Sequence, residues 1–387
     1  MTPLTISRDP ADVARRIGES IAGPAADAVD REARFPREAN DALREERMLG
    51  ALVPRELGGL GATIGEIASA CEALGRSCAS TAMIYAMHQI EVACLVRHGL
   101  ASPFFRDYLS DLARHEWLIA SATSEIGVGG DLRKSVCAVE RDGGQIRITK
   151  RAPVISYGEE ADDILLTARR VPDAAPADQL LVLVRKDGTT LTRTGNWDTL
   201  GMRGTRSFGF TIQAIGEAAQ IVPGSFADIA SQTMLPVSHV LWTSLWLGLA
   251  SDAVGRARAF VRTEARRTPG TVPPGGARLA ETVAELSTMS ASVQAGLADF
   301  ERHQNDPEAL GGLGFAIRMN NLKVSASRLA PEIVARALGV CGINGYRNDS
   351  PYAVGRHLRD AYGAALMINN DRVLGANAAM LLVHKDD

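Results

Sequence analysis

The sequence changes its pattern twice, and these changes divide the chain into helical, β-rich and helical parts. Near the N-terminus, Val13, Ile17 and Ile21 recur every four residues, which predicts a helix with one apolar face. After residue 116, short apolar or alternating runs are separated by Gly, Pro and Asp-Gly turns, which are typical of strands. Helical patterns return after residue 230. This order predicts an α+β fold with an N-terminal α-helical domain (1–116), a middle β-barrel or β-sandwich domain (117–230) and a C-terminal helical bundle (231–387).

Two of the predicted helical regions are unusually apolar. Residues 64–98 form one region rich in small residues, in which His88 is more typical of a buried core histidine than of a catalyst. Residues 237–249 are apolar almost all round, so this helix must be covered on every side. Neighbouring helices or another subunit could provide that cover, and the second option favours a homo-oligomer.

The composition excludes several classes of protein. A chain of 387 residues with 46% hydrophobic and 22% charged residues is typical of a globular protein with a large core. A net charge of −3 gives no reason to expect nucleic acid as a partner. The five cysteines are odd in number and lack metal-ligand spacing, so we expect reduced thiols, a cytoplasmic location and no metal site. We find no signal sequence and no uncharged apolar run of the ~20 residues that a membrane span needs.

The segment 122–131 combines hydroxyl groups with glycines directly after a predicted strand. Thr123 and Ser124 are adjacent, and Gly127, Gly129 and Gly130 follow. Glycines allow the backbone to approach a ligand closely, because no Cβ stands in the way. Hydroxyls and accessible backbone N–H groups suit a planar heterocycle joined to phosphates. On these ten residues alone, a simple glycine-rich turn explains the pattern equally well.

Three further segments complete a pattern that resembles the acyl-CoA dehydrogenase family of flavoproteins. Residues 122–131 resemble that family's Thr-Glu-Pro-x-x-Gly-Ser-Asp run, and 150–162 its Trp-Ile-Thr-Asn run. Residues 201–207, Gly-Met-Arg-Gly-Thr-Arg-Ser, match its Gly-x-Arg-Gly-Thr motif. Residues 339–361 resemble its Gly-Gly-x-Gly-Tyr and Arg-Asp-Ala motifs. The resemblance covers nearly the whole chain, and it implies that FAD lies between the β domain and the C-terminal helices.

The resemblance also implies which residues contact the flavin and its pyrophosphate. Thr123 and Ser124 would donate hydrogen bonds to the pyrimidine edge of the isoalloxazine ring. Ser156, in place of the family's Thr, would reach toward flavin N5. Gly129 and Gly130 would lie along the pyrophosphate, with Gly130 replacing the usual Ser.

Other positions are assigned to the cofactor on the same ground. Val154 replaces the usual Trp beside the flavin, and we also place Asn370 with the cofactor. Arg266 resembles the Arg of an Arg-x-x-Phe-Gly motif that meets the cofactor of a neighbouring subunit, although a solvated charge at a helix end explains it equally well. Cys341 and Gly342 stand where a Leu-Gly-Gly turn of the family approaches that same cofactor.

The usual catalytic carboxylate is missing. The family removes an α-proton from an acyl thioester with a Glu that follows the Arg-Asp-Ala helix, and Ile368 stands at that position. Some members carry the Glu earlier, where this chain has Ser238 and His239. We predict His239 or Asp371 as the base, because an imidazole titrates near neutrality and Asp371 lies one helical turn from Ile368. For Asp371, a solvated helix charge or a cofactor contact is the better explanation, and the role of base is the alternative.

Three functional hypotheses follow from the resemblance. The first is an FAD-dependent oxidoreductase that dehydrogenates the α,β-bond of an acyl thioester, carried by CoA or an acyl carrier protein, and passes electrons to an acceptor. The second is a flavin-dependent monooxygenase or oxidase of the same fold, for which no α-proton base is needed. The third is a catalytically silent flavoprotein scaffold. The family commonly forms tetramers, so we expect a homo-oligomer, either a dimer or a tetramer.

Overall fold

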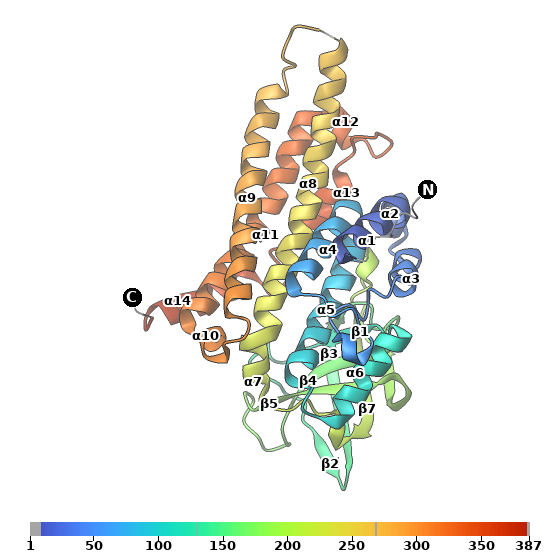
Figure 1. Cartoon of the computed structure of the whole chain (residues 1–387), viewed down its shortest axis with the longest axis vertical. Coiled ribbons are helices and arrows are strands. Elements are labelled where there is room, and N and C mark those ends of the chain that lie inside the picture. Colours follow the sequence, from blue (N-terminus) through green and yellow to red (C-terminus); the bar gives the residue numbers. More distant parts are fainter. Residues whose placement is uncertain (1–8, 130, 268, 385–387) are drawn as a thin grey trace.

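A computed structural model describes residues 9–129, 131–267 and 269–384 (Figure 1). Two β-sheets lie near one end of its long axis, and three long helices of the C-terminal part run side by side toward the other end. The N-terminal helices pack beside them. The helical, β and helical order confirms the predicted α+β fold, while the exact domain boundaries stay predictions.

The N-terminal part consists of helices that begin with residues suited to that position. Thr63 and Glu66 form a reciprocal capping box at the start of one of them, which satisfies two otherwise unpaired N–H groups. The predicted continuous helical region 64–98 is interrupted, because Cys78 adopts an extended conformation (φ −148°). The helices are α1 (Pro10–Ile17), α2 (Gly23–Glu32), α3 (Arg37–Glu45), α4 (Ile64–Ser77), α5 (Ala79–His98) and α6 (Pro103–His115).

Helix α5 is long and apolar enough to cross a membrane by length and composition. However, 89% of its apolar window is buried inside the protein, so it is a core helix. Its His88 is fully buried, with Nε2 2.9 Å from the Leu49 carbonyl and Nδ1 3.0 Å from the Ile119 backbone N–H. His88 is therefore a core residue with both ring nitrogens hydrogen-bonded.

The middle part contains two sheets, in agreement with the predicted barrel or sandwich. The first has the order β1-β4-β5, in which β1 and β4 are parallel and β4 and β5 are antiparallel. The second is antiparallel with the order β2-β3-β7-β6. The strands are β1 (Ile119–Ala122), β2 (Glu140–Asp142), β3 (Gln145–Ile155), β4 (Asp163–Arg169), β5 (Gln179–Arg185), β6 (Thr189–Arg193) and β7 (Phe208–Glu217).

The C-terminal part is a bundle built on α8, which packs against α4, α5, α9 and α11. These helices of the same chain cover the apolar segment 237–249 completely, so the segment gives no support for an oligomer. The helices are α7 (Phe226–Ile229), α8 (Leu235–Arg267), α9 (Gly276–His303), α10 (Pro307–Gly311), α11 (Leu313–Cys341), α12 (Ile343–Tyr346), α13 (Gly355–Tyr362) and α14 (Asn370–Leu381).

Short helical turns complete the chain. Single 3₁₀ turns occur at Arg55–Leu57, Lys186–Gly188, Arg203–Thr205 and Ala218–Gln220, and π-helical turns at Gly18–Ala22 and Ala230–Met234. The five cysteines are free and buried, as the sequence predicted. Among the described residues, no group of three or more His, Cys, Asp or Glu side chains is placed to hold a metal ion.

Candidate functional site

A cavity of about 730 Å³ lies where the β domain meets helices α5 and α8 and the segment 359–372. This volume is typical of a site for a small molecule or cofactor. Part of its wall is polar and comes from the loops after β1 and β3 and around the turn 203–205. The remainder is mostly apolar and comes from α5, α8 and the segment 366–369.

Three hydroxyls in the polar wall form a hydrogen-bonded chain with a fixed direction. The Thr205 hydroxyl donates to the Met202 carbonyl (2.8 Å), since a carbonyl can only accept. Thr205 Oγ1 is 2.8 Å from the Ser207 hydroxyl, which therefore donates to it. The Ser156 hydroxyl in turn donates to Ser207 (2.8 Å). All three protons are thus engaged, and Ser156 presents only acceptor capacity to a ligand in the cavity.

The predicted flavin contacts in the segment 122–131 line the same wall. Thr123 and Ser124 both contribute to the cavity, together with the half-exposed Val154. The Ser124 hydroxyl donates to the Val154 carbonyl (2.9 Å), which ties the loops after β1 and β3 together. Among the described residues the Thr123 hydroxyl has no hydrogen-bond partner, so it is free to donate to a ligand.

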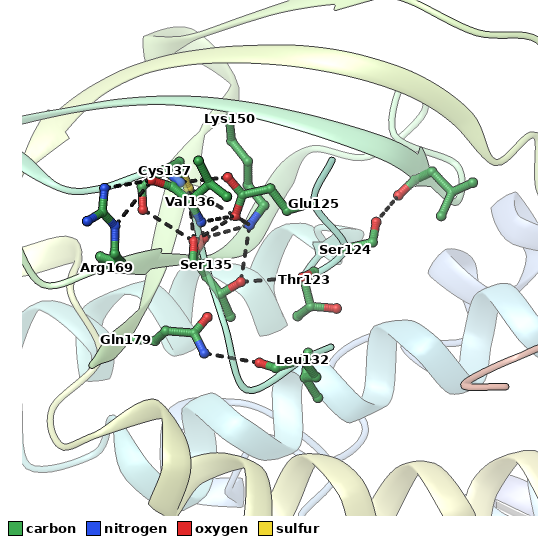
Figure 2. Close-up of polar contacts among 12 residues, drawn as sticks. Thr123, Ser124, Glu125, Leu132, Ser135, Val136, Cys137, Lys150, Arg169 and Gln179 are labelled. Carbon is green, nitrogen blue, oxygen red and sulfur yellow. Dashed lines mark hydrogen bonds and ion pairs between the residues drawn. The ribbon is translucent and has the colours of Figure 1, made fainter. Parts of the chain in front are cut away.

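A buried ion pair supports the loop that carries Thr123 and Ser124 (Figure 2). Lys150 Nζ lies 3.2 Å from Glu125 Oε2 and also donates to the Thr167 carbonyl (2.8 Å). The Glu125 carboxylate accepts further hydrogen bonds from the Ser135 hydroxyl and from the backbone N–H groups of Val136 and Cys137. Burial alone would raise the pKa of Glu125, but Lys150 and these hydrogen bonds together lower it. Glu125 is therefore ionised and fixes the loop.

Gly129 lies in the same loop, next to the cavity-lining Val128, and has a φ of +60°. Residues with a side chain rarely adopt this conformation, so the turn favours glycine here. A Cβ at this position would lie 3.9 Å from the guanidinium of Arg372, which lines the cavity from the C-terminal side. Gly130, the other predicted pyrophosphate contact, lies outside the described residues.

The motifs at residues 201–207 and 339–361 pack directly against each other at the cavity. The backbone N–H of Met202 donates to the Asp360 carboxylate (2.6 Å). A Cβ added to Gly201 would lie 2.2 Å from the carbonyl oxygen of Arg359, so only glycine fits. Burial raises the pKa of Asp360 to about 6, although Arg356 and the Met202 hydrogen bond oppose the rise. These contacts fit the two motifs together as a packing requirement.

Ile368 lines the cavity from the segment that precedes α14. Its φ is +46°, an unusual conformation for a β-branched residue, and its carbonyl accepts a hydrogen bond from the buried Lys323 (2.7 Å). Lys323 also donates to Oδ1 of Asn370 (2.7 Å), which in turn bonds Ser327. Asn370 thus joins α14 to α11 and does not line the cavity, so its contact with a cofactor stays a prediction.

The structure does not bring the two predicted bases to the cavity. His239 is buried, with its Nε2 3.2 Å from Asn320 Oδ1, and burial lowers its pKa to about 4. Asp371 is exposed in the first turn of α14, where its backbone N–H donates to Asn369. Neither residue belongs to the lining formed by the described residues, although Ser238 and Asn369 beside them do. Their catalytic roles therefore stay predictions.

Glu91 and Trp242 line the cavity but were missed in the sequence. Glu91 is 2% exposed, and its Oε2 has no hydrogen-bond partner among the described residues. Burial raises its pKa to about 8, although a hydrogen bond with Ser121 partly lowers it. The indole N–H of Trp242 is likewise buried without a partner. The sequence signal that could have pointed to Glu91 was its position as the single carboxyl group of a mostly apolar helix, two helical turns beyond Met83.

The remaining predicted contacts lie at the opposite end of the bundle. Arg266 is in the last turn of α8, and Cys341 ends α11. Gly342 follows with a φ of +56° and connects α11 to α12, which lies at the end of the molecule away from the sheets (Figure 1). None of the three lines the cavity, so a contact with cofactor would involve a neighbouring subunit and stays a prediction.

Comparisons with known proteins cover nearly the whole chain. The model described as acyl-CoA dehydrogenase, N-terminal domain, matches residues 8–116, and the model of the C-terminal domain matches residues 228–367. Amino sugar nitrososynthase DnmZ from Streptomyces peucetius is 27% identical over 353 residues, which cover 87% of this chain and 84% of that protein. Cyclohex-1-ene-1-carbonyl-CoA dehydrogenase from Syntrophus aciditrophicus (strain SB) is 24% identical over 356 residues. The aligned region covers 90% of this chain and 83% of that protein.

A solved structure gives the same fold. The FMN-bound dibenzothiophene monooxygenase TdsC from Paenibacillus sp. A11-2 superposes with a TM-score of 0.84 at 21% identity. The superposition covers 98% of each chain. At this level of identity the likeness establishes the fold alone. The similar proteins thus include an acyl-CoA dehydrogenase by name, a nitrososynthase and a monooxygenase.

Proposed function

The chain belongs to the acyl-CoA dehydrogenase family, and we propose that it is a flavin-dependent monooxygenase that oxidises a small organic substrate with molecular oxygen. The observation that carries this proposal is Ile368 in the wall of the cavity. The resemblance expects a carboxylate there, and an isoleucine cannot accept a proton. An oxygen-dependent oxidation has no need of an α-proton base at this position.

The carboxyl groups that do line the cavity support the same conclusion. Asp131 is paired with Arg133 (3.1 Å) and Lys134 (3.8 Å). Asp360 accepts the backbone hydrogen bond that joins two motifs. Glu91 has a pKa of about 8 because of its burial, so it is mostly protonated near neutral pH. Among the described lining residues, each carboxyl is therefore either engaged or uncharged.

The polar wall fits a flavin ring. Thr123 offers a free donor, Ser156 offers an acceptor, and Val154 provides an apolar surface between them. When bound, a reduced flavin supplies the electrons that activate oxygen. Because Ser156 can only accept, it suits an N–H donor, which flavin N5 carries in the reduced state. We take FAD as the cofactor on the family resemblance, with Arg266, Cys341 and Gly342 as contacts to the FAD of a neighbouring subunit.

The names of two similar proteins agree with this proposal. DnmZ is named as an amino sugar nitrososynthase and TdsC as a dibenzothiophene monooxygenase, so each name pairs an oxidation with a compound that contains nitrogen or sulfur. We therefore propose a small ring compound with an oxidisable nitrogen or sulfur as the substrate. A homo-oligomer, dimer or tetramer, is part of the proposal, because the FAD contacts at the end of α8 need a second chain. Light scattering of the purified protein measures the oligomeric state.

The decisive experiment compares two ways of reducing the bound flavin. Flavin absorbance and extraction first identify FAD or FMN in the purified protein. We expect anaerobic mixing with acyl-CoA and acyl-carrier thioesters to leave the flavin oxidised. After reduction by a separate flavin reductase, oxygen should reoxidise the flavin and transfer one labelled oxygen atom to a ring substrate. Bleaching by a thioester without any reductase would overturn the proposal, and a protein that binds no flavin would favour the silent scaffold.

The second candidate is dehydrogenation of an acyl thioester, with electrons passed to a separate acceptor. It is favoured by Glu91, a carboxyl group in the cavity whose ionised form, the minor one near neutral pH, could remove an α-proton in place of the missing Glu. His239 and Asp371 are further candidates for that role if the cavity rearranges. The thioester panel described above tests this candidate directly, since each of these bases predicts flavin bleaching under anaerobic conditions.

A further inference from the structure

Helices α5 and α8 place two unsatisfied polar groups in the apolar part of the cavity. Met83, Met87 and Glu91 follow one another at four-residue spacing on α5 and all line the cavity. Trp242 and Trp246 do the same on α8, and the two helices pack against each other. The only carboxyl group contributed by α5 to the described lining thus stands in an apolar and aromatic surrounding.

The burial of both groups is costly unless a ligand completes their hydrogen bonds. Glu91 is 2% and Trp242 is 6% exposed, and Oε2 of Glu91 and Nε1 of Trp242 lack partners among the described residues. A buried polar atom without a partner is uncommon in folded proteins and calls for an explanation, such as a bound water, ion or ligand. Nε1 of Trp242 needs an acceptor, and Oε2 of Glu91 needs a donor when the carboxyl group is ionised. A ligand that carries both an acceptor and a donor satisfies the two groups.

We propose that Glu91, with Trp242 and Trp246, binds the amino group of an amine substrate. This inference rests on the proposed function, whose substrate class it specifies. An ammonium group supplies the donor that Oε2 lacks and the positive charge that a buried carboxylate needs. The two indole rings, 6.5 Å apart, add the aromatic surface on which organic cations are commonly bound.

The protonation state of Glu91 makes the proposal measurable. Burial keeps the carboxyl group largely protonated near neutral pH, since its pKa is about 8. The titratable groups that interact with it are Cys94 on α5 and Tyr157 after β3, and burial raises the pKa of both, so they are neutral. A bound ammonium ion therefore forms a pair with Glu91 while the Glu91 proton leaves to solvent. For oxidation of the nitrogen, the ionised Glu91 takes a proton back from the ammonium and frees the lone pair.

The test is a binding measurement that needs no turnover. Benzylamine and benzyl alcohol have similar size and differ in charge, and titration calorimetry measures their affinities for the protein as purified. We expect benzylamine to bind about tenfold more tightly, the ratio that a hydrogen bond to a charged group provides. Its enthalpy should differ between phosphate and Tris buffers by an amount that corresponds to proton release. Equal affinities for the two probes would overturn the proposal.

Variants assign the preference to Glu91. Glu91→Gln keeps the shape but removes the charge, so the ratio between the two probes should fall to near one. Glu45→Gln is the matched control, because Glu45 is an exposed carboxylate on α3. A preference that survives Glu91→Gln contradicts the proposal. If that variant does not fold, the wild-type buffer comparison still decides, because amine binding without proton release excludes an ion pair at Glu91.

The outcome is separable from that of the proposed function. Amine preference is measured without oxygen or reductase, so it can hold even if oxygen transfer is never observed. Conversely, oxygen transfer to a sulfur or uncharged ring compound, together with equal binding of the two probes, would keep the monooxygenase and remove the amine site.

Discussion

Lys323 on α11 donates a hydrogen bond of 2.7 Å from Nζ to the backbone carbonyl of Ile368. Ile368 lines the cavity with a φ of +46°, a conformation that costs a β-branched residue roughly 1–2 kcal/mol. The same ammonium group binds Asn370 at the start of α14. Lys323 therefore holds the cavity wall in a conformation that the segment would otherwise avoid.

Replacing Lys323 by Met should loosen this wall and destabilise the protein. Two hydrogen bonds from a charged donor are lost, and each is worth about 1.5–3 kcal/mol when its partner is buried. We therefore expect urea denaturation to show a loss of at least about 1.5 kcal/mol in the free energy of unfolding. Arg328→Met, at an exposed position of the same helix, should change it by less than about 0.5 kcal/mol.

The pH dependence of the Lys323→Met effect has a definite sign. Burial lowers the pKa of Lys323 from 10.5 to about 8. Between these values the unfolded chain binds more protons than the folded one, so the wild-type protein gains stability as the pH rises through this window. The substituted protein lacks this gain, and the difference between the two should be larger at alkaline than at neutral pH. A difference that shrinks with rising pH would contradict this account of the buried ammonium.

Lys150→Met should be among the most damaging substitutions in the β domain. It leaves Glu125 buried without its cation, a change that typically costs about 3–5 kcal/mol. Adding Glu125→Gln should recover part of that loss, because the amide carries no charge and its one oxygen can still accept the hydrogen bonds of Ser135 and Val136, which both reach Oε2. The bond from the Cys137 N–H to Oε1 is lost, so the recovery is incomplete. Thermal unfolding of the single and double variants measures this recovery. A double variant less stable than Lys150→Met would show that the ion pair is not the main interaction.

The segment 201–207 could be predicted from sequence only because it matches a family motif, since its steric requirement comes from a residue far along the chain. Gly201 faces the backbone of Arg359, where only a hydrogen atom fits. Strand patterns are more directly informative: a continuous apolar run such as residues 180–184 is typical of a strand buried on both faces, and β5 is buried over this run. A strand pattern of this kind depends on neighbours in the chain, so it can be interpreted before the fold is known.

The cavity itself could not be predicted in the same way. A single charged residue in an apolar helix, such as Glu91, can face solvent, another subunit or a cavity, and only the packing of α5 against α8 decides. The break at Cys78 was missed because the residues on both sides favour helix. His239 was predicted as a base because of the chemistry of its side chain. Ser238, the preceding residue on α8, lines the cavity, but His239 lies on the next face of the helix and contacts Asn320.

Gly201→Ala should destabilise the contact between the motifs at residues 201–207 and 339–361. The added Cβ would lie 2.2 Å from the Arg359 carbonyl oxygen, and backbone cannot move aside cheaply. Overpacking of this kind costs about 1–3 kcal/mol or more. Gly339→Ala is the matched control, since its Cβ would meet no atom within 4 Å inside α11, and it should stabilise by about 0.5–1 kcal/mol. Equal unfolding temperatures for the two variants would contradict the steric account.

Glu91 should make the protein less stable as the pH rises. Burial raises its pKa from 4.5 to about 8, with the hydrogen bond to Ser121 opposing the rise. Between these values the folded protein binds the extra proton, so the free energy of unfolding falls with pH by up to about 1.4 kcal/mol per unit. Glu91→Gln cannot ionise and should lack this fall, which urea denaturation at a series of pH values measures.

Benzylamine gives this prediction an internal check. If its ammonium group pairs with Glu91, it stabilises the ionised carboxylate and lowers the pKa of that group toward its ordinary range. Saturating benzylamine should therefore flatten the fall in stability between about pH 5 and pH 8 in the wild-type protein and leave Glu91→Gln unchanged. Benzyl alcohol, which carries no charge, should leave the slope as it is. Identical pH profiles for the wild-type and Glu91→Gln proteins would show that Glu91 ionises normally, and the buried acid would then not be the group that selects an amine.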